Sequence, residues 1–222
     1  PSPLWLQKKL EQAGLRSVNN IVDVGNLILQ ELGQPLHIFD YQTIAEHTLQ
    51  ITSKTPFSEL ETLDSVNRLI PPDVLMICDP EKPLAFAGVI GGKSSAVSDK
   101  TSDILIEAAY FTPQSIRKSS KWLKIKTDAS QKLEKGIDPN LIPKALDYAA
   151  YLLQKVAGGK IVKGMIDQKT SSFAPKKIIC RTKRVNNILG TQLTPEDIFT
   201  ILFSADMHVI EQSAEQFQVF VP

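Results

Sequence analysis

The first hydrophobic pattern along the chain repeats every three to four residues. It begins with Leu4, Leu6 and Leu10, and Gly14 follows shortly after. Residues at that spacing lie on one face of a helix, and a glycine commonly ends one. The pattern therefore predicts an amphipathic helix over residues 3–14.

The next apolar stretch changes its period partway along. A β-branched run at 21–24 predicts a short strand, and the leucine and isoleucine residues of 27–32 return to helical spacing. Gly33 is the expected stop signal of that helix. The pattern places Asn26 at the entrance of the helix and His37 in the loop just past its exit. From sequence alone, this histidine is either satisfied by a backbone carbonyl or part of a pocket wall.

Short β-like runs separated by Pro and Asp turns dominate the following segment. They lie at 48–53, 61–63, 74–78 and 84–89. Residues 60–64 and 67–70 suggest a hairpin with Ser65 in its turn. A longer apolar run at 104–109 predicts a buried strand that carries a single carboxylate, Glu107. On the pattern alone, Glu107 would be an outward-facing strand residue.

The second half of the chain alternates helices and strands less regularly. Helical signals cover 113–122 and 139–157, a strand signal covers 161–166, and the polar segment 169–175 is typical of a linker. Beyond the linker the pattern predicts a strand at 176–181, helices at 181–189 and from 194, and a strand at 217–221. Many short strands with non-alternating helices indicate an α+β fold. We expect two domains, residues 1–170 and 171–222.

Charge says little about partners at the level of the whole chain. Lys and Arg number 25 against 24 Asp and Glu, a net charge of +1, which argues against an autonomous RNA-binding protein. One local cluster departs from this balance: Arg117, Lys118, Lys121, Lys124 and Lys126. Such a cluster is either a solvated helix face or an edge that attracts a polyanion.

Cysteine and histidine usage excludes several classes. Cys78 and Cys180 each lie in an apolar run, which is typical of buried, reduced thiols in a cytoplasmic protein. Two Cys and three His offer no zinc-ligand spacing.

No apolar stretch is about 20 residues long, so we expect no membrane role. The chain starts without Met and ends on an apolar strand, so we expect a piece of a longer polypeptide.

Four sequence blocks carry a family resemblance. The first runs from Arg-Ser-Val-Asn-Asn at 16–20 to Gln-Pro-Leu-His at 34–37, and the others are Ala-Phe-Ala-Gly-Val-Ile-Gly-Gly at 85–92, Ile-Leu-Ile-Glu-Ala-Ala-Tyr-Phe-Thr-Pro at 104–113 and Thr-Asp-Ala-Ser-Gln-Lys-Leu-Glu-Lys-Gly-Ile-Asp-Pro at 127–139. In this order and spacing they resemble the editing domain of the bacterial phenylalanine–tRNA synthetase β subunit. The segment beyond the linker resembles the first part of the small DNA-binding-like domain that follows it. The resemblance implies a layered, β-sandwich-like core with helices packed against it.

The family's chemistry rests on one hydroxyl group. An apolar pocket for phenylalanine rejects tyrosine by only about 10²-fold, whereas a site that hydrogen-bonds the phenol discriminates by about 10⁴–10⁵. By resemblance, Glu107 accepts that hydrogen bond, and Gly91, Thr127 and Ala129 line the pocket. The resemblance thus implies hydrolysis of mischarged Tyr–tRNA(Phe).

The same resemblance assigns the reacting end of the site. It implies that His37 and Asn26 position the ester and its water, and His37 could also be a general base. Backbone N–H groups around Gly91 and Gly92 are our candidates for oxyanion donors. We expect Glu107 to stand across the cavity from His37, separated by the roughly 6–7 Å of a tyrosyl group.

Departures from the family pattern leave a second interpretation open. Gly25 stands where a threonine is usual, Lys124 where a glycine is usual, and Lys132 and Leu133 replace an arginine and a phenylalanine. The chain could therefore be a non-catalytic scaffold or tRNA-docking segment of the same β subunit. Gly25 and Lys132 leave room for that alternative, and a deacylation assay separates the two.

The resemblance also implies partners and cofactors. The partners are the tRNA(Phe) 3′ end, which the basic cluster would guide, and an α subunit in an assembly of two α and two β subunits. We expect no cofactor and no metal in this segment. ATP and magnesium would serve aminoacylation elsewhere in the whole enzyme, because the chain carries no ATP-binding class II signature.

Overall fold

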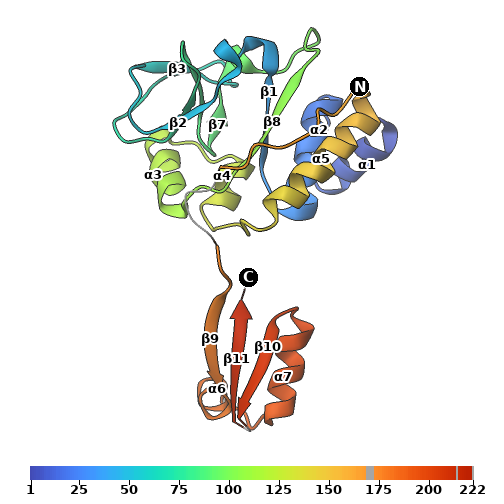
Figure 1. The fold of residues 1–222 in the computed structure, drawn as a ribbon, viewed down its shortest axis with the longest axis vertical. Helices are drawn as coiled ribbons and strands as arrows, with labels where there is room; N and C mark the ends of the chain where they lie inside the picture. Colours follow the sequence, from blue (N-terminus) through green and yellow to red (C-terminus); the bar gives the residue numbers. More distant parts are fainter. Residues whose placement is uncertain (169–172, 214, 222) are drawn as a thin grey trace. The chain divides into compact units, whose positions relative to one another are not determined.

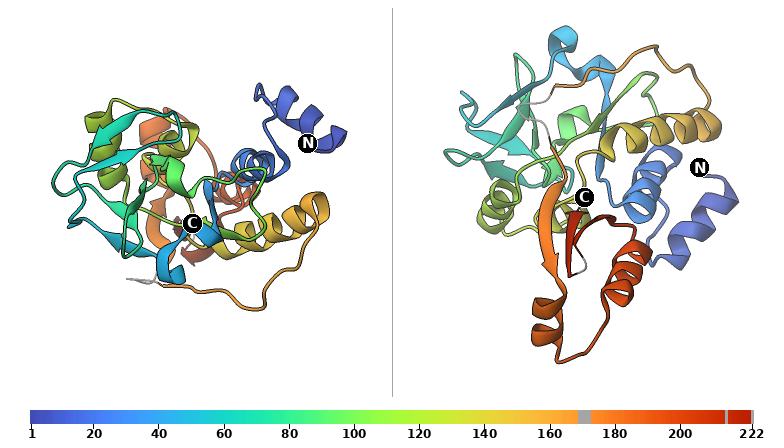
Figure 2. Two further views of the ribbon diagram at one scale, coloured as in Figure 1. Left: turned by 90° about the horizontal axis from the view of Figure 1, so that it is seen from above. Right: turned by 60° about the horizontal axis from the view of Figure 1, so that its bottom comes forward.

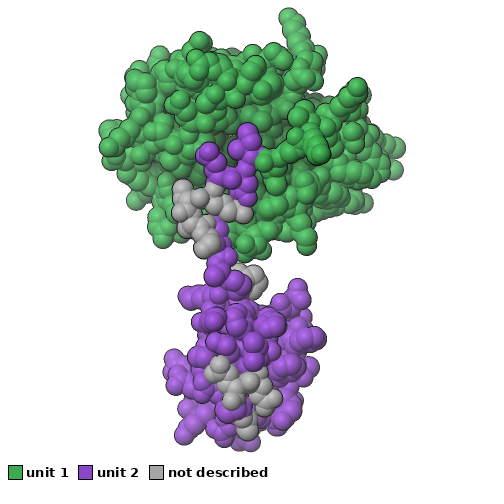
Figure 3. All heavy atoms as spheres, viewed as in Figure 1, with its two compact units in different colours: residues 1–165 green, residues 166–222 purple. Residues whose placement is uncertain are grey.

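The computed structural model describes residues 1–168, 173–213 and 215–221. The chain divides into two compact units, residues 1–165 and 166–222 (Figures 1 and 3). Most of the predicted linker, residues 169–172, lies outside the described residues. In the part of the chain that is described, no helix is both long and apolar enough to cross a bilayer.

Three helices of the first unit share one hydrophobic core. They are α1 (Leu4–Gln12), α2 (Asn20–Leu32) and α5 (Ile142–Ala157), and α2 lies beside α5 (Figures 1 and 2). Leu6, Leu10, Ile28, Ala145 and Ala149 are fully buried between them. The predicted helices at 3–14 and 139–157 are confirmed, with α5 beginning three residues later than expected.

The β-branched run at 21–24 is helical, so the predicted strand there is wrong. Asn19 caps α2, because its side chain accepts hydrogen bonds from the backbone N–H groups of Ile21 and Val22 at 3.0 and 2.9 Å. This cap and the burial of Val24 outweigh the strand preference of β-branched residues. Asn26 consequently lies in the middle of α2 and not at its entrance.

Two strands form a ribbon that separates the helical core from a second core. Strand β1 (Leu36–Asp40) pairs antiparallel with β8 (Ile104–Ala108), with Ile38 opposite Ile106 and Phe39 opposite Leu105. The isoleucine pair packs into the helical core, whereas the Phe39–Leu105 pair packs into the second core. Because alternate residues of a strand face opposite sides, one ribbon serves both cores.

The second core belongs to a four-stranded antiparallel sheet and a hairpin. The sheet has the order β2-β5-β6-β7, formed by Gln50–Thr52, Met76–Cys78, Pro83–Phe86 and Ile90–Gly91. The predicted hairpin is present as β3 (Glu59–Glu61) and β4 (Asn67–Leu69). Its turn residue Ser65 has φ 61°, a left-handed conformation that a glycine would adopt more easily.

Two further helices pack on the sheet side of the ribbon (Figure 1). Helix α3 (Pro113–Leu123) follows the predicted pattern and ends at Lys124, which has φ 55°. Helix α4 (Asp128–Leu133) was not predicted. Thr127 and Ser130 form its capping box, a start signal that the sequence did contain.

The strand predicted at 161–166 is also wrong. Residues 158–168 form neither helix nor strand, and Val162 and Ile166 are 86% and 93% exposed. The run is apolar, but it pairs with no strand within the residues that the structure describes.

The second unit is a three-stranded antiparallel sheet with two helices. Its elements are β9 (Lys176–Arg181), α6 (Thr182–Leu189), α7 (Pro195–Ser204), β10 (His208–Ser213) and β11 (Gln216–Val221), with strand order β10-β11-β9. Ile198, Phe217 and Val219 form its small core. Strand β10 was not predicted, whereas the other elements were. Both units combine helices with antiparallel sheets, which confirms the α+β fold class.

Candidate functional site

A cavity of about 80 Å³ lies where the ribbon meets the four-stranded sheet and α4. Apart from His37 and Glu107, the side chains that line it are apolar, and several are small. The lining residues are Pro35, Leu36, His37, Ile77, Ala85, Phe86, Gly88, Val89, Ile90, Gly91, Glu107, Ala109, Phe111, Ala129 and Leu133. The cavity is therefore well below the roughly 300–1,000 Å³ of drug-sized ligand sites, and it suits at most a single side chain.

His37 and Glu107 are direct partners in the β1–β8 pair. Opposite residues of an antiparallel pair have Cα atoms about 4.5–5.5 Å apart and side chains on the same face. Neither a hydrogen bond nor an ion pair joins these two side chains within the described residues. Both residues line the cavity from neighbouring strands, and the expected separation of one tyrosyl group between their polar atoms stays a prediction.

The His37 ring contacts an aromatic ring and lies close to a glycine. Phe39 packs against it edge-on, with centroids 4.3 Å apart and an interplanar angle of 77°. Gly91 also lies against the ring, since a Cβ atom added to Gly91 would lie only 2.3 Å from His37 Cε1. The ring can occupy this position only because Gly91 has no side chain. His37 itself belongs to strand β1, and not to a loop as predicted.

The electrostatic state of His37 follows from its burial. Its Nε2 atom is buried and has no hydrogen-bond partner among the described residues. Burial lowers the pKa of His37 to about 4, so the imidazole is neutral at pH 7. Nε2 is also sealed by the atoms around it, so a water molecule or a ligand reaches it only if those atoms move.

The pKa of Glu107 is shifted in the opposite direction, and burial is again the cause. Burial raises the pKa of Glu107 to about 7, because the charged carboxylate loses its water. Near neutral pH the group is therefore divided between its acid and its carboxylate. In either form it retains an oxygen that can accept a hydrogen bond, and as the acid it can also donate one.

Some backbone groups of Gly91 and Gly92 already form hydrogen bonds within the protein. The Gly92 N–H donates to the Leu84 carbonyl at 2.6 Å, and the Gly91 carbonyl accepts from Leu63 N–H at 3.0 Å. The prediction that Gly92 supplies an oxyanion donor is therefore wrong. A Cβ atom at Gly92 would lie 2.6 Å from the Leu84 carbonyl oxygen, so this glycine permits the close approach of two strands.

The structure brings four of the six predicted site residues to the cavity. His37, Glu107, Gly91 and Ala129 line it. Thr127 does not, but its hydroxyl donates to the carbonyl of the lining residue Val89 at 2.8 Å and so supports the wall. Asn26 is half-buried on α2 and is not among the lining residues.

Sequence reasoning missed several apolar walls of the cavity. Gly88 has φ 66°, and a Cβ atom there would lie 2.7 Å from Ile116 and 2.9 Å from both Phe111 and Leu133. This turn brings α3 and α4 against the sheet and closes one side of the cavity. The block at 85–92 gave a signal, since its glycines have no place in a regular strand.

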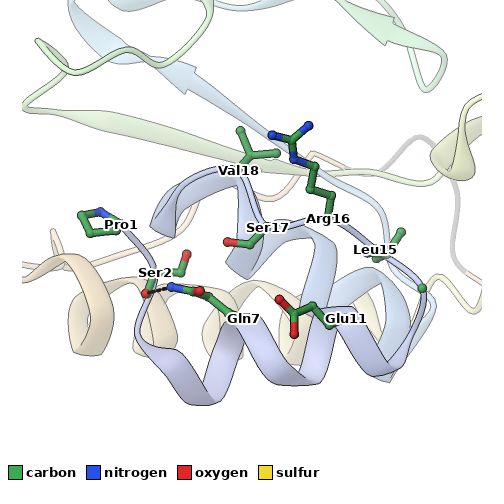
Figure 4. Close-up of a pocket in the computed structure, with 9 residues that line it drawn as sticks. Pro1, Ser2, Gln7, Glu11, Leu15, Arg16, Ser17 and Val18 are labelled. Atoms are coloured by element: carbon green, nitrogen blue, oxygen red, sulfur yellow. Dashed lines mark hydrogen bonds between the residues drawn. The ribbon is translucent and has the colours of Figure 1, made fainter.

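A second, larger depression lies at α1 and has different chemistry (Figure 4). Its volume is about 610 Å³, and it is open. The hydroxyl groups of Ser2 and Ser17 both donate to the buried carboxylate of Asp23, and Gln7 donates to the Ser2 carbonyl. Because these groups satisfy one another, they tie α1 to α2 and do not present free polar atoms to a ligand.

No metal centre emerges from the described residues. No group of three or more His, Cys, Asp or Glu side chains there is placed to hold an ion. Cys78 is buried and Cys180 half-buried, and both are free thiols.

Comparisons with known proteins agree with the sequence resemblance. Residues 1–158 match the B3/4 domain family. The whole chain is 45% identical to the phenylalanine–tRNA ligase beta subunit of Protochlamydia amoebophila, and 94% of it is 47% identical to that of Syntrophotalea carbinolica. The chain spans only 28% and 26% of the length of these two relatives.

A solved structure is also similar in part. It is an N-terminal fragment of the phenylalanyl-tRNA synthetase beta subunit from Pyrococcus horikoshii, with 13% identity and a TM-score of 0.42 over 91% of this chain and 59% of that one. The family match and the two relatives confirm the resemblance found in the four blocks. The chain therefore belongs to the B3/4 domain family and is homologous to a segment of phenylalanine–tRNA ligase beta subunits.

Proposed function

We propose that this chain carries the editing site of a phenylalanine–tRNA ligase, at which tyrosine is hydrolysed from mischarged tRNA(Phe). One observation carries the proposal: an otherwise apolar cavity receives two polar side chains, His37 and Glu107, from opposite positions of one strand pair. A cavity with one phenol acceptor and one group for the ester is what selective clearance of tyrosine requires.

Glu107 supplies the discrimination. The phenol of a tyrosyl group donates a hydrogen bond to the Glu107 carboxyl group. A phenylalanyl group has no hydroxyl and would leave that buried carboxyl group unpaired. A difference of that kind is worth about 10⁴–10⁵ in selectivity at sites that hydrogen-bond a hydroxyl. The small lining residues Gly91 and Ala129 leave room for the ring.

His37 acts at the ester. A water molecule attacks the carbonyl carbon of the ester, and the terminal ribose oxygen leaves and takes up the proton. With a pKa of about 4, His37 is a weak base at pH 7, so its role would be to orient the water and not to deprotonate it. Gly91 supports this role because its bare Cα lets the ring lie against it.

The proposal extends to the whole enzyme. The tRNA(Phe) 3′ end and an α subunit are its partners, and ATP and magnesium serve aminoacylation outside this chain. An alternative is that the chain is a non-catalytic docking segment. The position of Asn26 away from the cavity favours that alternative, as do the departures at Gly25 and Lys132.

A deacylation assay on the assembled ligase tests the proposal. Glu107→Ala should lose the clearance of Tyr–tRNA(Phe) by about 2–4 kcal/mol in transition-state binding, the range for a charged hydrogen bond and its desolvation. Glu11→Ala removes an exposed carboxylate on α1 and is the matched control. Unchanged tyrosine clearance in the Glu107 variant would contradict the role of Glu107, whereas a wild-type ligase that does not clear tyrosine would favour the docking alternative.

A further inference from the structure

The surface formed by α3, α4 and their connection is strongly basic, although the chain as a whole is nearly neutral. Residues 113–135 contain seven basic and two acidic side chains, against a net charge of +1 for all 222 residues. All seven basic residues are exposed, and within the described residues none of them forms an ion pair. This surface therefore offers positive charge that no part of the described chain neutralises.

Trp122 lies near the end of α3, between Lys121 and Lys124 in the sequence. It is 48% exposed, and no aromatic ring of the described residues packs against it. On α3 it follows Lys118 by four residues and Lys121 by one, so a lysine lies beside it on the same helix face. The inner side of α3 is occupied by Ile116, which is buried, and leaves Trp122 outside the core.

Lys124 adds a cation at a position that disfavours it. It is the C-cap of α3 with φ 55°, a left-handed conformation that glycine adopts without cost and other residues at about 1 kcal/mol. A lysine here keeps a positive charge two residues from Trp122 at the expense of backbone strain.

We propose that Trp122, with Lys118, Lys121 and Lys124, forms a stacking platform for an unpaired base of single-stranded RNA. Exposed aromatic rings among cations are the usual means of binding single strands, because the ring stacks on a base while the cations follow the phosphates. The inference deepens the proposed function and rests on it only for the identity of the RNA, which would be the tRNA 3′ end.

The chain connects this platform to the cavity directly. Three residues after Lys124, Thr127 donates a hydrogen bond to Val89 in the cavity wall, and Ala129 on α4 lines the cavity. A strand of RNA held along α3 and α4 is therefore held beside the site where its terminal ester would react.

A membrane surface fits the same features less well. A helix that lies in a bilayer interface needs a broad apolar face turned outward. The apolar residues Ile116 and Leu123 of α3 pack into the protein, so Trp122 alone is offered on the exposed side.

Tryptophan fluorescence tests the stacking directly, because the chain has two tryptophans. Trp5 is a natural control: it is 40% exposed on α1 and has Lys8 and Lys9 nearby, but Lys9 is paired with Glu31. In the Trp5→Phe chain, an unstructured oligoadenylate of about eight nucleotides should quench the remaining Trp122. In the Trp122→Phe chain it should leave Trp5 unquenched. Equal quenching of both would overturn the proposal.

Affinity for the same labelled oligoadenylate gives a second readout. Trp122→Ala should weaken binding at least about fivefold, and Trp5→Ala should leave it unchanged. Lys124→Gly should raise the midpoint of urea unfolding while it weakens binding and lowers the salt slope by about 0.7. A Lys124→Gly chain that binds with unchanged affinity and slope would contradict a role in phosphate contact.

Two further arms separate this inference from other outcomes. Binding of phosphatidylserine vesicles that depends on Trp122, with no oligoadenylate binding, would overturn the RNA assignment in favour of a membrane. Glu107→Ala should leave oligoadenylate binding intact. The stacking proposal and the editing proposal therefore fail in different assays.

Discussion

His37 and Glu107 occupy opposite positions of one antiparallel strand pair, and burial shifts both toward their neutral forms. The pKa of His37 falls to about 4 and that of Glu107 rises to about 7. Between these values the strand pair presents a neutral imidazole next to a carboxyl group that is largely protonated. In this range the same two side chains would carry opposite charges in water, whereas here they are kept largely uncharged.

These opposite shifts predict opposite effects of pH on stability. The unfolded chain binds protons at His37 more tightly than the folded one, so this residue makes the free energy of unfolding rise between about pH 4 and 6.5. Glu107 does the reverse, and its contribution is present below about pH 4.5 and lost as pH rises through 7. In the wild-type chain the two slopes oppose each other.

Substitution should separate the slopes. Between about pH 4.5 and 6.5, the free energy of unfolding of Glu107→Gln should rise relative to wild type by about 2–3 kcal/mol. That of His37→Gln should fall relative to wild type by about the same amount. Urea unfolding at a series of pH values measures both. Parallel pH profiles for the two variants would show that the shifts are not opposite.

Gly91→Ala should impair hydrolysis through His37. The new methyl group would lie 2.3 Å from His37 Cε1, so the ring must move away from the position that Gly91 now permits. We expect a fall in the deacylation rate of about 10²-fold, typical of a misplaced reacting group. In a His37→Ala background, Gly91→Ala should cost little, because the clash is gone. Additive losses in the double variant would argue against the contact.

Ala129→Trp should fill the cavity and stop editing without unfolding the chain. The cavity has a volume of only about 80 Å³, and Ala129 is one of its walls. Gln131→Trp places the same indole on the exposed side of α4 and is the control. Circular dichroism checks the fold, and phenylalanine charging by the assembled ligase should be unaffected in both. Normal tyrosine clearance by the Ala129 variant would remove the cavity from the mechanism.

Asn26→Ala should reduce hydrolysis less than His37→Ala does. The resemblance gave both residues a catalytic role, but only His37 lines the cavity, while Asn26 lies in the middle of α2. Single-turnover deacylation of Tyr–tRNA(Phe) compares the two. An equal or greater loss for Asn26→Ala would restore it to the reacting centre and imply that the substrate extends beyond the cavity toward α2.

Gly25→Ala should stabilise the chain. Gly25 lies within α2, and a Cβ atom there would meet nothing within 4 Å. Replacing a helical glycine with alanine gains about 0.5–1 kcal/mol. Gly33→Ala in the same helix should do the opposite, because Gly33 is the C-cap with φ 68°. Thermal unfolding measures both, and a destabilised Gly25→Ala chain would mean that this position has an unseen steric constraint.

Local signals in the sequence were sufficient for most of the elements. The stop at Gly33 and the capping box at Thr194 mark helix ends that the structure confirms. The strand predicted at 21–24 is wrong because the strand preference of β-branched residues is weaker than the effect of a well-formed helix cap. The Asn19 side chain sets the start of α2, and periodicity does not reveal a cap.

The site was predicted in its residues but not in its arrangement. Glu107 and His37 were identified by resemblance, yet their pairing depends on the register between β1 and β8, which are separated by more than sixty residues of chain. Register is set by which faces are buried in the assembled cores, and no local pattern contains that information. The same limit explains why Gly88 was missed, since its role depends on Ile116 and Leu133 from other elements.

The ribbon of β1 and β8 lets natural selection act on stability and on chemistry at alternate residues. Ile38 and Ile106 face the helices, so substitutions there are tested by how well α1, α2 and α5 fit against them. His37 and Glu107 face the other way and are tested by what the cavity can bind. A lineage could rebuild its helical layer, or reshape its cavity, while the other side of the same two strands stays unchanged.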